Sequence, residues 1–189
     1  MTVADQDQVV PFTRDLMKEF LEGEGLAYFR DRDDDLLAFF RGRSPEGSIR
    51  AWFSLREESI YSITIESSYR LGRRGFPAWY VRCNEWNSTR SWPAVHVLPS
   101  DEVDQTGAVL VRVIAEEQVD LRQGIHRSLF TSYSNNVLSG GLAFFAALEE
   151  QLYGPEGAPA RAKSTDRRTR QASTTTSSAP ASAEPPVAP

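Results

Sequence analysis

The chain contains few of the residues that disulfides, metal sites and nucleophilic catalysis use. It has one cysteine, Cys83, and two histidines, His96 and His126, among 189 residues. A single cysteine excludes an internal disulfide, and a Cys/His zinc site has too few ligands. Gly-x-Ser-x-Gly, P-loop and dinucleotide-binding motifs are all missing. We therefore expect a protein that is not an enzyme and that needs no cofactor and no metal.

Long apolar runs and a positive charge excess are missing as well. No stretch approaches the roughly 18 apolar residues of a membrane-spanning helix, so we expect no membrane partner. The 21 basic and 26 acidic side chains give a net charge of −5, which offers no reason to expect nucleic acid as a partner. The first residues lack the basic and apolar regions of a signal peptide. The expected compartment is the cytoplasm.

Aromatic side chains are missing after Tyr153. Residues 154–189 consist mainly of Ala, Pro, Ser and Thr and carry five basic and three acidic side chains. This composition predicts a disordered tail, because it cannot bury enough apolar surface to offset its ordering entropy. The tail has a net charge of +2, which leaves −7 on the rest of the chain. We divide the chain into a flexible N-terminus at 1–10, an α+β domain at 11–153 and this tail.

Hydrophobic periodicity in the domain predicts the element order α-β-β-β-β-α-β-β-α. Short connections between successive strands favour antiparallel neighbours. Runs of strands interrupted by a few helices predict an α+β fold, with an antiparallel sheet and helices packed on one face. Helices are expected at residues 11–22, 77–88 and 124–152, and strands at residues 26–32, 35–43, 48–55, 59–69, 91–99 and 108–120.

The last predicted helix contains a phase change in its apolar stripe. The stripe shifts at Ser139-Gly140-Gly141, where two glycines weaken a helix. We expect a bend there, or two helices packed end to end.

The stretch "CNEWNSTRSWP" connects the second helix to the next strand. Helical spacing puts Cys83 and Trp86, with Trp79 upstream, on one buried stripe. Asn84 and Asn87 are expected to satisfy the helix end and hold the turn. Trp92-Pro93 opens the strand, where proline is tolerated. A buried Trp86 predicts a loss of about 3–5 kcal/mol on truncation to alanine.

Two groups of residues are candidate sites. Trp52 lies on the strand face opposite Phe53, and we take Trp52, Tyr61 and Trp92 as candidate partner-binding residues, because an aromatic surface on a solvated sheet face usually marks a partner. In the alternative, the last helix covers this face. Arg73 and Arg74 precede a helix N-terminus, which favours anions; the other interpretation is a plain connecting loop.

Four stretches together resemble the YbjN family of bacterial proteins. They are the FL-x-x-x-G-L start, "DLLAFF", "CNEWNSTRSWPAVHV" and "VDLRQGIHRSLFTSY". The similarity spans about residues 12–152, and the structural signature is Asn84, Trp86, Asn87, Trp92 and Pro93. The family is described as sensory transduction regulators or chaperone-like proteins. The resemblance implies a fold like that of type III secretion chaperones, a homodimer and a protein-binding role, with no catalytic residues.

Two functions follow as hypotheses. The first is a non-enzymatic, chaperone-like or regulatory adaptor that holds a client protein on an apolar surface. The alternative is a sensor of a small anionic ligand, built on Arg73 and Arg74.

Overall fold

The computed structural model describes residues 8–42, 47–72 and 76–153 of the chain. The predicted tail and residues 1–7 of the predicted flexible N-terminus lie outside the described residues. Val9 and Val10, which we also expected in that flexible segment, instead form β1 (Val9–Val10), and β1 pairs with β8 (Ile125–His126). Both strands are too short to show a period, so the sequence pattern did not reveal them.

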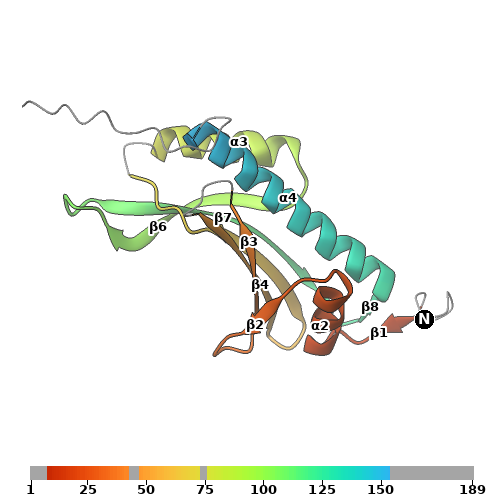
Figure 1. The fold of residues 1–189 in the computed structure, drawn as a ribbon. Coiled ribbons are helices and arrows are strands. Elements are labelled where there is room, and N and C mark those ends of the chain that lie inside the picture. The colour runs from red at the N-terminus through yellow and green to blue at the C-terminus, as the bar shows by residue number, and fades with distance from the viewer. Residues whose placement is uncertain (1–7, 43–46, 73–75, 154–189) are drawn as a thin grey trace, which may run out of the picture.

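Six strands form one sheet in the order β2-β3-β4-β5-β7-β6 (Figure 1). Every neighbouring pair in this sheet is antiparallel. The predicted α+β fold with an antiparallel sheet is therefore confirmed. The strands are β2 (Tyr28–Arg30), β3 (Leu36–Arg41), β4 (Ser48–Arg56), β5 (Ile60–Ser67), β6 (Ala94–Val103) and β7 (Val109–Asp120).

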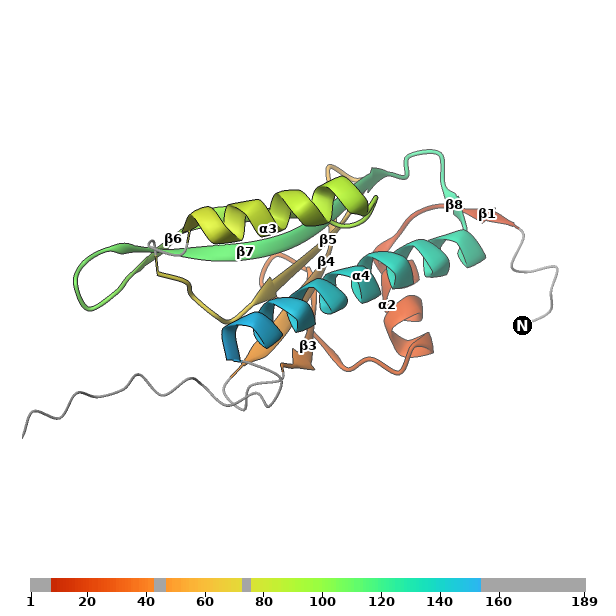
Figure 2. The ribbon, with the colours of Figure 1, turned by 90° about the horizontal axis from the view of Figure 1, so that it is seen from above.

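Three helices pack on one face of this sheet, as expected. They are α2 (Arg14–Gly23), α3 (Phe76–Thr89) and α4 (Arg127–Tyr153), and Figure 2 shows α3 and α4 lying over the strands. Aromatic side chains join α2 and α4 to the sheet: Phe130 of α4 lies 4.9 Å from Tyr61 and 6.0 Å from Phe20 between ring centroids. Among the described helices, none has both the length and the apolar character that crossing a bilayer requires.

The first helix begins three residues later than its proline suggested. Thr13 is the N-cap, and its Oγ1 accepts a hydrogen bond of 3.3 Å from the Leu16 N–H. A threonine side chain satisfies a free N–H of the first turn, so Thr13 sets the start in place of Pro11.

The predicted alternative of two helices packed end to end is wrong, because α4 is one helix of 27 residues. Its two glycines allow close packing. A Cβ at position 141 would lie 2.3 Å from Cδ1 of Ile65, and a Cβ at position 140 would lie 2.9 Å from Cδ of Pro93. The glycines therefore let α4 approach β5 on one side and the start of β6 on the other, and this close packing outweighs their low helix propensity.

Candidate functional site

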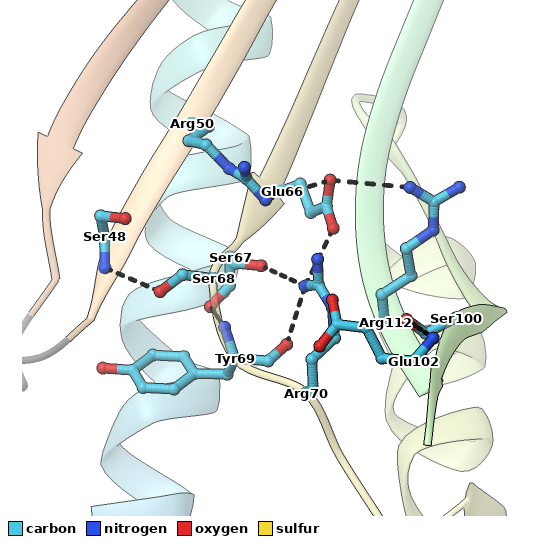
Figure 3. Close-up of polar contacts among 10 residues, drawn as sticks. All are labelled: Ser48, Arg50, Glu66, Ser67, Ser68, Tyr69, Arg70, Ser100, Glu102 and Arg112. Atoms are coloured by element: carbon cyan, nitrogen blue, oxygen red, sulfur yellow. Dashed lines mark hydrogen bonds and ion pairs between the residues drawn. The ribbon is translucent and has the colours of Figure 1, made fainter. Parts of the chain in front are cut away.

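The candidate site is the side of the sheet that faces away from the helices, which we call the open face. Successive side chains of a strand point to opposite faces, and the register places Leu37, Trp52 and Thr64 beside one another on this side. Figure 3 views the sheet from here, with α4 behind the strands. Within residues 8–42, 47–72 and 76–153, no element covers the open face (Figure 1). The last helix packs on the opposite face, so the alternative in which it covers Trp52 is wrong.

Apolar side chains gather on the open face near the β2 edge of the sheet. We call Phe29, Leu37, Phe39 and Trp52 the aromatic strip. Phe29 and Phe39 are 65% and 50% exposed, and their rings meet edge to face with centroids 5.8 Å apart. Isolated exposed apolar side chains are ordinary, but a contiguous set on an uncovered sheet face indicates a surface that meets a partner.

Next to the aromatic strip lies a carboxylate surrounded by three guanidinium groups (Figure 3). Glu66 of β5 is only 4% exposed. Its Oε1 lies 3.0 Å from Nη1 of Arg70, and its Oε2 lies 3.8 Å from Nη2 of Arg50 and 3.7 Å from Nη1 of Arg112. We call these four residues the arginine cluster. Three guanidinium groups around Glu66, with the Glu102 carboxylate paired to Arg70, leave a formal charge of +1 in a domain that is otherwise acidic.

The three arginines of the cluster differ in how fully they are bound. Arg70 also donates from Nε to Glu102 at 2.8 Å and from Nη1 to the Ser67 carbonyl at 3.2 Å, so it connects the end of β5 to β6. Arg50 and Arg112 lie farther from Glu66 than a hydrogen bond allows. Among the described residues, no hydrogen bond reaches Nε of Arg50 or of Arg112, and both of these atoms are buried. Arg70 is therefore a structural group, whereas Arg50 and Arg112 meet Glu66 at ion-pair distance only and have partly exposed side chains.

The structure separates the three residues predicted to bind a partner. Trp52 lies on the open face. Tyr61 is 0% exposed in the core and hydrogen-bonds to Ser134 at 2.9 Å; its assignment to a binding surface is wrong, because its position in β5 points it under α4. Trp92 is 47% exposed but packs against Tyr133 of α4, on the helix side of the sheet.

Other residues of the open face were not singled out from the sequence. In "LLAFF" both faces of β3 carry apolar residues, so alternation alone could not say that Phe39 is exposed. Arg50, Glu66 and Arg112 belong to three different strands, and only the strand order brings them together. The available signal was that each of these charged residues lies between apolar residues of its strand or at the strand's end.

Comparison with known proteins identifies the family. The family described as "YbjN: Putative bacterial sensory transduction regulator" matches residues 13–150. The chain belongs to the YbjN family. The crystal structure of YbjN from E. coli, described as a putative transcription regulator, superposes with a TM-score of 0.57 at 11% identity, covering 76% of this chain and 96% of that one. This likeness shows the fold.

A second solved structure is less similar. An uncharacterized protein from Methanothermobacter thermautotrophicus matches with a TM-score of 0.39 at 14% identity, covering 74% of this chain and 99% of that one. No curated protein sequence matches the chain.

The structural signature of the YbjN resemblance lies where α3 turns into β6. The side-chain amide of Asn87 accepts from the Val95 N–H at 2.8 Å and donates to the Val95 carbonyl at 2.9 Å. Trp86 Nε1 donates to the Pro93 carbonyl at 3.1 Å, and the Trp92–Pro93 peptide bond is cis. Asn84 is exposed on α3. Asn87 and Trp86 thus tie the helix to the strand that follows it.

Cys83 is buried, as the predicted helical stripe indicates. Burial raises the pKa of the Cys83 thiol to about 11, so Cys83 stays protonated at neutral pH and is a poor nucleophile. Arg73 and Arg74 lie outside the described residues, and the anion site there stays a prediction.

On the helix side of β7, Glu117 supplies a pH-dependent contribution to stability. Burial raises the pKa of its carboxyl, and the neighbouring Glu116 charge adds to this. The folded state therefore holds the proton more tightly than the unfolded state, and stability falls as the pH rises from the unfolded pKa through the raised one. We expect Glu117→Gln to remove this fall and raise the melting temperature at pH 7.

Thermal melts between pH 4 and pH 8 test this expectation. Glu24→Gln, at an exposed position, is the control and should leave the pH profile unchanged. An unchanged profile for Glu117→Gln would contradict the role of Glu117.

Proposed function

We propose that the chain is a non-enzymatic protein-binding module of the bacterial cytoplasm, acting as a chaperone-like protein or a regulatory adaptor. The observation that supports it is the aromatic strip, in which Phe29 and Phe39 are half or more exposed and in mutual contact on an uncovered sheet face. Aromatic side chains are enriched where proteins bind one another. A regulator, as the family is described, acts through a partner, which agrees with this proposal.

In this proposal the partner is a client or regulatory protein that lays a segment along the open face. Chaperones that hold a client use apolar pockets and sheet surfaces to take extended chain segments. A homodimer is also part of the proposal, since α4 and the open face offer surfaces for a two-fold contact. No nucleic acid and no membrane is involved.

Site-specific photo-crosslinking in the host bacterium tests this function. A benzophenone amino acid replaces Phe29, and a second variant carries it at Ser132, an exposed position on α4. We expect position 29, and not position 132, to give discrete adducts with another protein. In the Phe39→Ser background these adducts should fall by about tenfold, because an interface anchor is lost.

The adduct masses separate the outcomes. Adducts with a different protein that depend on Phe39 support the binding module. An adduct of the chain with itself alone assigns the open face to the homodimer and removes the client from it. No adduct at position 29, or equal adducts with a different protein at both positions, contradicts the proposed function.

A further inference from the structure

The arginine cluster has more donors than its carboxylate uses. A guanidinium group carries five N–H donors in a planar fork that suits a carboxylate. Arg50 and Arg112 approach Oε2 of Glu66 only to 3.8 and 3.7 Å, and their side chains are 30% and 42% exposed. Both groups therefore hold a positive charge at the surface, and because their Nε atoms are buried, the donors left for a ligand are on the Nη nitrogens.

These donors lie directly beside apolar side chains. Arg50 pairs with Phe39 across β3 and β4, and its guanidinium carbon lies 5.2 Å from the centroid of the Trp52 ring. Arg112 belongs to β7, on the other side of β5. A segment that crosses these strands thus meets apolar surface at Phe39 and then positive charge at Arg50 and Arg112.

Charge complementarity selects the occupant. The chain's own residues 154–189 carry +2, so the tail does not match the positive end of the open face. A nucleic acid presents a long row of phosphates, and the −7 carried by residues 1–153 repels such a polyanion. A protein segment with a few carboxylates next to an apolar side chain matches both parts of the surface.

We propose that the segment bound by the open face is acidic, with Asp or Glu side chains on Arg50 and Arg112 and an adjacent apolar side chain on Phe39. This rests on the proposed protein-binding function and names the chemistry of the partner. Glu66 lies on β5 between the two guanidinium groups and also forms an ion pair with Arg70.

The experiment uses the full chain with the benzophenone at position 29, in the host bacterium. Arg50→Gln/Arg112→Gln removes both partly exposed guanidinium groups, and Arg82→Gln/Arg122→Gln removes two arginines that pair with Glu85 and Asp120 elsewhere. We expect the first pair to lower the adduct yield by about tenfold, because charge-assisted hydrogen bonds are lost. The control pair should change it by less than about twofold.

In the first variant the buried Glu66 carboxylate loses two ion-pair partners. A triple variant keeps the test decisive if that double variant does not fold. Arg50→Gln/Glu66→Gln/Arg112→Gln replaces the buried carboxylate with a neutral amide, and its melting temperature is compared with that of the wild type. It should show the same loss of adducts while staying folded.

Sequencing the crosslinked segments by mass spectrometry completes the test. Segments with more Asp and Glu than Lys and Arg around the crosslink support the proposal. Adducts that form normally in the glutamine variants, or on basic segments, overturn it and leave the protein-binding function standing. Adducts that carry nucleic acid overturn it as well, and no adducts in the wild type remove both proposals.

Discussion

Trp86→Ala is expected to lower the free energy of unfolding by about 3 kcal/mol, at the low end for a tryptophan because its side chain is half-buried. Three contacts are lost together. The Trp86 ring meets Phe144 of α4 edge to face at 5.3 Å, lies 5.3 Å from the Arg90 guanidinium carbon, and donates from Nε1 to the Pro93 carbonyl. Urea denaturation followed by circular dichroism measures the loss.

Two further variants separate these contacts. Trp86→Phe keeps an aromatic ring but removes the donor, and should cost about 1 kcal/mol, the value of one hydrogen bond. Tyr80→Ala, at a position on α3 that is 54% exposed, is the control and should stay within about 0.5 kcal/mol of the wild type. An unchanged stability in Trp86→Ala, combined with lost adducts at position 29, would make Trp86 a partner contact instead.

Gly141→Ala is expected to destabilise the protein by about 1–2 kcal/mol through overpacking, although the same change in a free helix stabilises by about 1 kcal/mol. The reason is the 2.3 Å that would separate the new Cβ from Cδ1 of Ile65, a side chain with 0% exposure. Ile65→Val removes that carbon and by itself costs about 1 kcal/mol. In the double variant the clash is gone, so it should be no less stable than Ile65→Val alone.

This double-mutant cycle has a matched control on another helix. A Cβ at Gly23, the last residue of α2, meets no atom within 4 Å. Gly23→Ala should therefore be neutral or stabilising, and it should add independently to Ile65→Val. If Gly141→Ala is itself stabilising, or if the two changes at 141 and 65 are additive, α4 does not need the glycine to approach β5.

Much of the fold could be predicted from local sequence. Ile49, Ala51 and Phe53 of β4 alternate with more polar neighbours, and these three residues are buried under the helices as the period-two pattern indicates. The stripe on α3 is partly right: Cys83 is 4% exposed, and Trp79 and Trp86 are half-buried against the core.

The failures have a common physical cause. Gly140 and Gly141 were interpreted from helix propensity alone, yet their effect depends on Pro93 and Ile65, which are distant in sequence. Tyr61 was interpreted as surface, yet α4 covers it. In each case a tertiary contact outweighs a local preference, which propensity scales do not include.

The features of the candidate site also fall into those that the sequence predicts and those that depend on tertiary contacts. Composition, motifs and a period of two residues were enough to predict the six strands of the large sheet, the family, the acidic domain with its basic tail, and the side of β4 on which Trp52 points. Which face stays open, and the meeting of Arg50, Glu66 and Arg112 on it, depend on contacts between distant parts of the chain. That meeting depends on β5 lying between β4 and β7, and strand order is set by the packing of the whole sheet under α4, which no local stretch of the chain encodes.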